Sequence, residues 1–320
     1  MDKIKEFRYT TREINHGSEN EVMQSIPNKR AGDSNQITRE YFDSLLIEMR
    51  HIDSVIPSTE LKLYGEIFST PIMTAALSHL DNCRPNGMAE MAKGAFTSNA
   101  VMWTGMGDEA ELESTTATGA RTIKIIKPYA DNNIIFKKIE HAEKCGVLAM
   151  GMDIDHAFNS RGKYDNVLGM PMLPKTFDEI RSFIQSTKLP FIIKGVLSEQ
   201  DAYKCAEAGA GGIVVSHHHG IMGFAVPPLM ILPKIVKAIE HSMPIFVDCG
   251  VMNGIDVFKA LALGASAVSA GRVLMNPLAD DGANGVHKKI QEMTEELSGV
   301  MTRTCSKDIL NIDPSLIWRR

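Results

Sequence analysis

Short apolar segments rich in β-branched residues alternate with longer helical patterns from about residue 70 to the end of the chain. This alternation is typical of βαβ units, whose strands form a parallel sheet. A doubly wound open sheet would show the same alternation. The chain has eight such segments, however, and no GxGxxG motif follows the first of them, which favours a closed (β/α)8 TIM barrel. The segments expected to be strands are 70–75, 100–104, 122–127, 147–152, 189–194, 211–216, 244–248 and 266–270.

The remaining N-terminal part is expected to be an extension of the barrel. The chain has 320 residues, whereas a simple barrel needs roughly 250. We assign residues 1–65 to an N-terminal helical extension packed on the barrel, with a helix from Thr38 to His51, and residues 66–320 to the barrel itself. The clearest helical patterns within the barrel cover 132–145, 176–186, 198–208 and 254–263.

Composition narrows the classes of function. With 44% hydrophobic and 23% charged residues the chain is an ordinary globular protein. A net charge of −5 provides no general attraction to nucleic acid. No apolar run reaches the roughly 18 residues of a membrane span, and the first residues lack the apolar stretch of a signal peptide. The five cysteines have no paired spacing, as in reduced thiols. We expect a cytoplasmic protein that binds a small molecule, without nucleic-acid or membrane partners.

Polar residues end four of the expected strands or follow them closely. They are Lys194, His218, Asp248 and Arg272, at steps of about 24 to 30 residues along the chain. One step corresponds to one βα unit, so these side chains should meet at the carboxyl face of the barrel, where barrel enzymes have their active sites.

The run Ser216-His217-His218-His219-Gly220 is the most distinctive of these strand ends. Three histidines suggest metal, but adjacent residues of an extended segment point to opposite sides, and no HExxH or paired-carboxylate pattern accompanies them. We therefore predict no metal site. A general base fits better, because a histidine accepts a proton near neutral pH. A purely structural role for all three histidines remains an alternative.

A catalytic histidine needs a carboxylate that orients it and stabilises its charged form. Asp153 is the first candidate, because it directly follows the apolar segment 147–152. Asp155 is the second candidate and Asp248 the third. Each of them could instead cap a helix.

The end of the last βα unit predicts a phosphate site. Gly271-Arg272 follows the strand at 266–270, so backbone amides and a guanidinium can both approach an anion. Phosphate sites of barrels often lie in the loops after strands 7 and 8, which here contain Asp248-Cys249-Gly250 and Gly271-Arg272. A phosphate-bearing cofactor is therefore expected.

Taken together, these motifs resemble the family of FMN-dependent α-hydroxy-acid oxidases and dehydrogenases, over about residues 52 to 276. The motifs in this order and at these spacings identify the family more specifically than any single motif does. The matching segments are 69–76, 193–196, 216–220, 248–251, 258–265 and 271–272.

The resemblance implies FMN as cofactor and a small substrate whose hydroxyl-bearing carbon is oxidised by hydride transfer to flavin N5. It makes His218 the base, Asp153 its carboxylate partner and Lys194 the cation beside the flavin. It also implies a homo-oligomer, because members are often tetramers. The residues expected to contact FMN are Ala75, Ala76, Thr104, Lys194, Ser216, Asp248, Gly250, Gly271 and Arg272.

The chain departs from the family at the substrate side. Members usually have an arginine one or two residues after the His-Gly pair, and it clamps the substrate carboxylate. Here Ile221 and Met222 follow Gly220, and no lysine or arginine occurs between Lys204 and Lys234. Neither apolar side chain can replace a bidentate cation.

Two further departures concern cations and the third strand. Met252-Asn253 stands where the family has two arginines, which removes a phosphate contact. Ile125-Ile126-Lys127 replaces Gln-Leu-Tyr, so Lys127, or Lys124, is expected to enter the site.

Arg161 lies one residue out of register with the family's second substrate arginine. Arg161, Lys163 and Lys127 are our candidate replacement cations, although the first two could be solvent-facing loop charges.

The missing clamp leaves other functions open. A non-redox isomerase or lyase that uses reduced flavin is one alternative, as in type 2 isopentenyl diphosphate isomerase, a related flavin barrel. An oxidoreductase whose substrate is not a 2-hydroxy carboxylate is another, and a binding protein without catalysis is a third.

Overall fold

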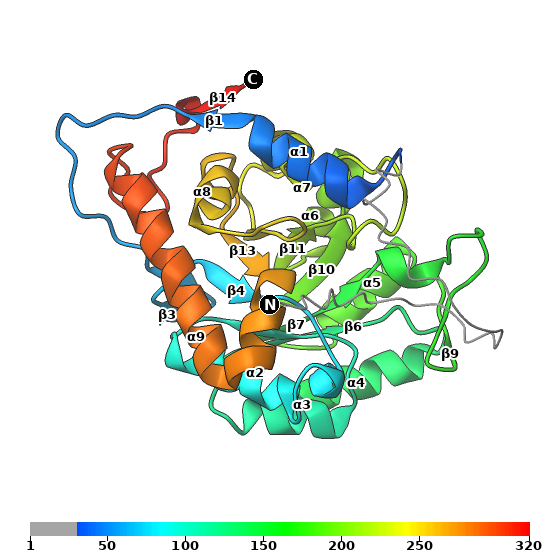
Figure 1. Cartoon of the computed structure of the whole chain (residues 1–320). Coiled ribbons are helices and arrows are strands. Elements are labelled where there is room, and N and C mark those ends of the chain that lie inside the picture. Colours follow the sequence, from blue (N-terminus) through cyan, green and yellow to red (C-terminus); the bar gives the residue numbers. More distant parts are fainter. Residues whose placement is uncertain (1–30) are drawn as a thin grey trace, which may run out of the picture. The chain divides into compact units, whose positions relative to one another are not determined.

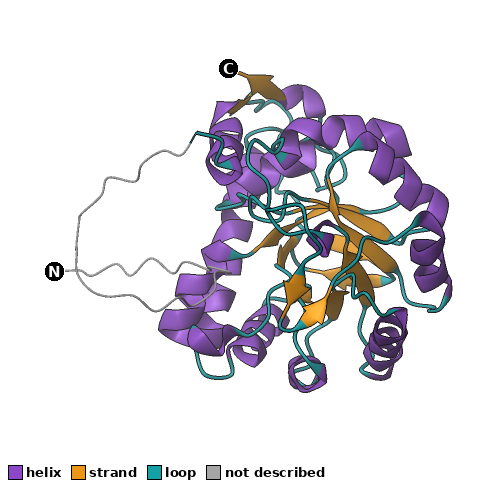
Figure 2. Cartoon of the chain, turned by 90° about the vertical axis from the view of Figure 1, so that its right-hand side faces the viewer, coloured by secondary structure: helices purple, strands orange, loops and turns teal. Residues whose placement is uncertain are grey.

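Eight parallel strands form the centre of the molecule, with helices around them (Figure 2). The computed structural model describes residues 31–320, so residues 1–30 of the expected extension lie outside the described residues. Each strand pairs with its neighbours in chain order, which confirms the (β/α)8 barrel and all eight expected strands. The barrel strands are β4 (Ile72–Thr74), β5 (Met102–Thr104), β6 (Thr122–Ile126), β7 (Ala149–Asp153), β10 (Phe191–Val196), β11 (Gly212–Val215), β12 (Ile245–Val247) and β13 (Ala267–Ala270).

The first and second strands close the barrel by a few contacts. The backbone N–H of Thr74 donates to Val101 O at 3.1 Å. Leu77 forms an isolated parallel bridge with Thr104. These contacts link β4 to β5 and leave no open edge for another chain to pair with.

Helices follow the barrel strands and cover their outer side (Figures 1 and 2). The four expected barrel helices are present with their ends shifted by at most one residue. Among the described residues, no helix is both long enough and apolar enough to cross a bilayer. The helices are α2 (Gly87–Thr97), α3 (Glu109–Thr116), α4 (Asn132–Lys144), α5 (Phe177–Gln185), α6 (Glu199–Ala208), α7 (Pro228–Ile239), α8 (Gly254–Ala262) and α9 (Arg272–Thr302).

The described part of the N-terminal extension differs from the expected helix at Thr38–His51. The helix α1 covers Ser34–Ser44, and the chain then continues as β1 (Leu45–Ile47). This strand pairs antiparallel with β14 (Ile317–Arg319) at the other end of the chain. The expected helix was therefore wrong after residue 44, because pairing with a distant segment overrides the local helical pattern.

The two ends of the barrel are covered by different parts of this N-terminal segment. The hairpin of β2 (Leu61–Leu63) and β3 (Glu66–Phe68) lies at the amino end, where the Tyr64 hydroxyl donates to Gly211 O at 2.9 Å. The helix α1 lies at the carboxyl end, where Thr38 Oγ1 is 2.7 Å from His217 Nε2. The helix therefore borders the face on which the polar strand ends meet.

Large side chains fill the barrel interior below that face. The rings of Trp103 on β5 and Phe246 on β12 meet edge to face with centroids 5.4 Å apart. These two strands are not neighbours in the sheet, so the contact crosses the interior. Gly151 on β7 lies so close to β10 that a Cβ there would be 2.0 Å from Ile192 O.

We expect Gly151→Ala to destabilise the protein by about 1–3 kcal/mol, because the added methyl group must push two packed strands apart. The free energy of unfolding, measured by chemical denaturation, tests this. Gly299→Ala is the matched control, because a Cβ at this half-buried position of α9 meets only Arg303 Nη1 at 3.7 Å. The control should be neutral or stabilising by up to about 1 kcal/mol. Equal behaviour of the two variants would contradict the expectation.

Candidate active site

Buried charged side chains gather where the barrel strands end. Asp153 on β7 and Lys194 on β10 are register partners, and their side chains are 5% and 8% exposed. Asp248 follows β12, and Lys127 follows β6. The expected meeting of Lys194, Asp248 and His218 at one face is thus what the structure shows.

The ammonium groups and carboxylates of this cluster neutralise one another. Asp153 Oδ2 accepts a hydrogen bond from Lys127 Nζ at 2.8 Å, and Asp153 Oδ1 lies 3.0 Å from Lys194 Nζ. Lys194 Nζ is also 3.4 Å from Asp248 Oδ2. Charges this deeply buried are tolerated only with such partners.

The pKa values of the cluster follow from burial and pairing. Burial alone would raise the pKa of Asp153, but Lys127, Lys194 and His218 hold it well below its ordinary value. Burial alone would lower the pKa of Lys194, but Asp153 and Asp248 hold it well above its ordinary value. Asp153 is therefore an anion and Lys194 a cation at neutral pH.

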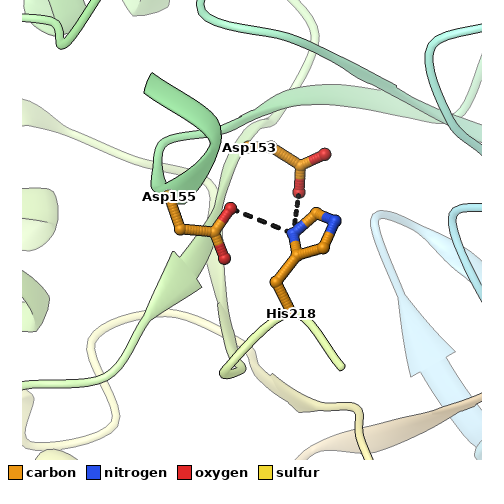
Figure 3. Close-up of side chains that lie close together, drawn as sticks. All are labelled: Asp153, Asp155 and His218. Carbon is orange, nitrogen blue, oxygen red and sulfur yellow. Dashed lines mark hydrogen bonds and ion pairs between the residues drawn. The ribbon is translucent and has the colours of Figure 1, made fainter. Parts of the chain in front are cut away.

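His218 stands beside this cluster in a left-handed backbone conformation, with a φ of 47°. Its N–H donates to Ser216 Oγ at 2.9 Å, which supports the turn. Its Nδ1 lies 3.0 Å from Asp155 Oδ1 and 3.6 Å from Asp153 Oδ1. Figure 3 shows both carboxylates directed at this one nitrogen. Among the described residues its Nε2 makes no hydrogen bond, so Nε2 is the nitrogen left for a substrate.

The other two histidines of the run contact α1 instead. His217 Nε2 bonds Thr38 Oγ1, and His217 Nδ1 accepts the N–H of Gly220 at 2.9 Å. His219 Nδ1 lies 2.6 Å from Asn35 Oδ1. Burial lowers the pKa of both rings, that of His219 to about 4. The three histidines therefore do not converge on one point.

A metal ion does not fit the carboxylate pair, although Asp153, Asp155 and His218 place one ligand atom each within 4.8 Å of one another. Lys194 Nζ lies 3.0 Å from Asp153 Oδ1 and 3.5 Å from His218 Nδ1. The ammonium group thus holds the position and the charge that a metal ion would need.

Most residues expected to contact a cofactor surround the same face. Thr104 on β5 is an exception, because it is the register partner of Lys124 and follows the inward-facing Trp103, so its buried hydroxyl points away from the interior. Gly250 has a φ of 88°. A Cβ on Gly271 would lie 3.1 Å from Ala75 Cβ, which brings the ends of β13 and β4 together. Ala76 directly follows Ala75.

Arg272 begins α9, and Gly271 is its N-cap without a side-chain cap. A helix start without a side-chain cap, next to a guanidinium, suits an anion such as phosphate. Arg272 Nη2 also donates to Asn35 Oδ1 at 3.3 Å, so α1 borders this end of the site as well.

Of the three candidate replacement cations, Lys127 alone lies within the charged cluster. Arg161 and Lys163 are exposed on the loop between β7 and α5. This loop contains the short hairpin of β8 (Asn166–Val167) and β9 (Met170–Pro171).

Two side chains near the cluster were not among the predicted site residues. The His156 ring meets the His218 ring edge to face, with centroids 4.3 Å apart. Tyr129 is buried, its hydroxyl lacks a partner in the described structure, and burial together with Asp153 raises its pKa to about 12. Both follow an expected strand end by a few residues, and that position was the available signal.

Comparisons with known proteins agree with this geometry. The model of a family described as FMN-dependent dehydrogenase matches residues 27–178 and 172–319. The chain is 30% identical to glycolate oxidase 3 of Arabidopsis thaliana over 305 residues, covering 84% of this chain and 81% of that protein. It is 28% identical to an L-lactate oxidase of a Roseobacter species over 293 residues, covering 81% and 79%. A mandelate oxidase variant with an FMN adduct superposes with a TM-score of 0.82 at 27% identity, covering 90% of this chain and 92% of that chain.

Lys124 points away from the cluster, because it stands three residues before Lys127 on a strand whose side chains alternate. Its Nζ donates to Gly107 O at 2.8 Å in the loop before α3. Burial lowers the pKa of this lysine from an ordinary value of 10.5 to about 8. Lys124 therefore does not enter the site, and burial of its positive charge destabilises the folded protein.

We expect the buried ammonium of Lys124 to make stability depend on pH. Between about pH 8 and 10.5 the unfolded chain keeps this proton and the folded protein loses it, so stability should rise by up to about 3 kcal/mol. The free energy of unfolding across this range should rise in the parent protein relative to Lys124→Met. Lys137→Met on α4 is the control and should retain the rise. A parallel pH dependence of the parent and Lys124→Met would refute the prediction.

Proposed function

We propose, because this chain belongs to the family of FMN-dependent dehydrogenases, that it is an FMN-dependent oxidoreductase that oxidises a 2-hydroxy acid or a related hydroxyl-bearing substrate. The observation that carries the proposal is the position of His218. Its Nδ1 faces two carboxylates, Asp155 and Asp153, beside the buried cation Lys194. This is the arrangement of a base next to a site that accepts negative charge.

The residues at the barrel mouth fit FMN. Gly271 has no side chain, so the backbone between β13 and α9 can approach a bound group closely. The start of α9 with Gly271 and Arg272 would hold the phosphate. Lys194 would stand beside the ring system, while Ala75, Ala76, Ser216, Asp248 and Gly250 are the remaining candidates for contacts. FMN, when bound, supplies the acceptor for the two electrons removed from the substrate.

The protein supplies the proton acceptor. With a carboxylate accepting the Nδ1 proton of His218, Nε2 is free to take the proton of the substrate hydroxyl. The imidazolium that forms is stabilised by the facing carboxylates. Lys194 keeps its charge because its pKa is raised by Asp153 and Asp248, so a permanent cation offsets negative charge that develops at the barrel mouth.

Lys127 is the proposed contact for the substrate carboxylate. An ammonium group has three donors, and one of them is used by Asp153 Oδ2. The other two are available at the same face as His218. Arg161 and Lys163 are proposed only as additional cations, because both are exposed on the loop after β7.

A cytoplasmic homo-oligomer, such as a tetramer, is part of the proposal. The oligomeric part is supported by the resembling family, whose members are often tetramers, and the cytoplasmic part by five cysteines without paired spacing, as in reduced thiols. Light scattering coupled to gel filtration measures the subunit number directly, and a monomer would contradict this part alone.

Anaerobic spectroscopy tests the proposed reaction. The purified protein should be yellow with a flavin spectrum, and a 2-hydroxy acid from a screen should bleach it without oxygen. His218→Asn should keep the flavin spectrum and lose the bleaching. A flavin spectrum that no 2-hydroxy acid bleaches would contradict the substrate class and leave the cofactor in place. A colourless protein that does not bind added FMN would contradict the proposal as a whole.

We expect Lys127→Met to raise KM for the bleaching acid by about 10-fold or more, because a charge-assisted hydrogen bond worth roughly 1.5–3 kcal/mol is lost. Steady-state kinetics on the flavin-loaded protein measures this. Lys163→Met and Arg161→Met remove exposed cations of the same charge and should change KM less than 3-fold. A larger effect of either loop variant than of Lys127→Met would show that the carboxylate binds at the loop.

A further inference from the structure

A second histidine stands beside His218 at the barrel mouth. His156 belongs to the short 3-10 turn η2 (Asp155–Ala157), which follows β7. Its ring meets the His218 ring edge to face, with centroids 4.3 Å apart. The side chains of His156 and His218 are 19% and 23% exposed, so each ring is mostly covered but keeps an open part. His156 is therefore close enough to contact a substrate that His218 contacts.

The ring of His156 is uncharged at neutral pH. Burial lowers its pKa, and the positive charges of Lys127 and His218 lower it further. Asp153 and Asp155 oppose this effect, but the pKa still falls from an ordinary value of 6.5 to about 4. His156 thus meets a substrate as a neutral imidazole with one donor and one acceptor nitrogen.

Asp165 decides which nitrogen is the acceptor. Its Oδ2 lies 3.3 Å from Nδ1 of His156. A hairpin returns the chain to this point, because Phe158 bridges Tyr164 and the N–H of Asp165 donates to Ala157 O at 3.0 Å. An ionised carboxylate only accepts hydrogen bonds, so the proton of the neutral ring lies on Nδ1. Nε2 remains as the acceptor, and it makes no hydrogen bond among the described residues.

This protonation state selects the chemical group that His156 can bind. A carboxylate oxygen and Nε2 are both acceptors, so His156 is no partner for the substrate carboxylate. An ammonium group on the substrate would be repelled by the cations Lys127 and Lys194 of the same mouth. A hydroxyl is a neutral donor and meets both conditions.

The spacing of the two rings indicates where this hydroxyl belongs on the substrate. In the proposed function, Nε2 of His218 takes the proton of the 2-hydroxyl. The His156 ring lies directly against the His218 ring, so a group that meets both rings must carry its two hydroxyls close together. Hydroxyls on neighbouring carbons fulfil this requirement.

We propose that His156 determines specificity by accepting a hydrogen bond from a 3-hydroxyl, which makes 2,3-dihydroxy acids the preferred substrate class. Asp165 is the positioning residue that keeps Nε2 of His156 free as the acceptor. The proposal rests on the proposed function, in which His218 and Lys127 meet the 2-hydroxyl and the carboxylate.

Binding of acids that cannot react tests this specificity without turnover. 2-Hydroxy-2-methylpropanoate and the enantiomers of 2,3-dihydroxy-2-methylpropanoate lack the hydrogen on carbon 2 that hydride transfer requires. Their dissociation constants follow from the change that each acid causes in the flavin spectrum of the holoprotein. One enantiomer of the dihydroxy acid should bind about 3- to 10-fold more tightly than the monohydroxy acid, which is the range of one neutral hydrogen bond.

Two variants separate hydrogen bonding from packing. His156→Phe keeps a flat ring against His218 and removes the acceptor, so it should still bind the monohydroxy acid but lose the preference. His156→Gln keeps a side-chain acceptor and should retain part of the preference. His51→Phe is the control and should keep all of it, because His51 is exposed on the segment after β1.

Nitrogen NMR adds a readout at the histidine itself. Long-range 1H–15N correlation spectra of histidine-labelled holoprotein distinguish the two neutral tautomers, and His156→Phe assigns the ring signals. The parent should show the Nδ1–H tautomer of His156. The dihydroxy acid should shift the Nε2 signal of His156 more than the monohydroxy acid does.

The outcomes separate this proposal from the proposed function. Equal binding of the two kinds of acid to the parent, a preference that His156→Phe retains, or an Nε2–H tautomer would overturn the role of His156 alone. If no 2-hydroxy acid binds to the holoprotein or bleaches its flavin, the proposed function fails, and the specificity proposal fails with it.

Discussion

The buried pair of Asp153 and Lys194 is the interaction on which the site depends. The two residues are register partners on neighbouring strands, and their charged atoms lie 3.0 Å apart. Each charge would be expensive to bury alone, by several kcal/mol per ion. The pair therefore ties the register of β7 to that of β10, and Lys127 extends the same tie to the end of β6. A slip of one residue would turn these side chains to the opposite face.

The apolar layer beneath the cluster and α1 beside it make these charges effective. Trp103 and Phe246 fill the interior below the cluster. Little water therefore reaches the charged side chains from the interior, and their charges are weakly screened on that side. The helix α1 borders the same face through the contacts of Thr38 with His217 and of Asn35 with His219. In such a setting, fixed charges act more strongly on a reacting group than they would in water.

The fold could be predicted from sequence because each barrel strand is a short apolar run bounded by turns. The same reasoning failed at β1, whose partner β14 lies at the other end of the chain and leaves no local signal. Convergence of Lys194, His218 and Asp248 followed from the one-unit spacing. The roles of His217 and His219 did not, because their partners belong to α1.

Strand alternation could have settled which lysine enters the site. Lys124 and Lys127 stand an odd number of residues apart, so one of them had to face outward. Strand alternation could not rank Asp153 and Asp155 as partners of His218. It depends on the turn η2, on the bulge at Gly195 and on distances that differ by 0.6 Å between the two carboxylates. Loop geometry of this kind has no periodic pattern in the sequence.

The charged side chains of this site form one connected network. Lys127 brings a second cation to Asp153. That carboxylate then has two lysines to neutralise and stands 3.6 Å from the histidine. A second carboxylate, Asp155, lies two residues later in the space left by Gly195 and makes the hydrogen bond instead. Lys127 and His218 are therefore coupled through Asp153, which faces both of them, so a change at either residue alters the charge that the other meets.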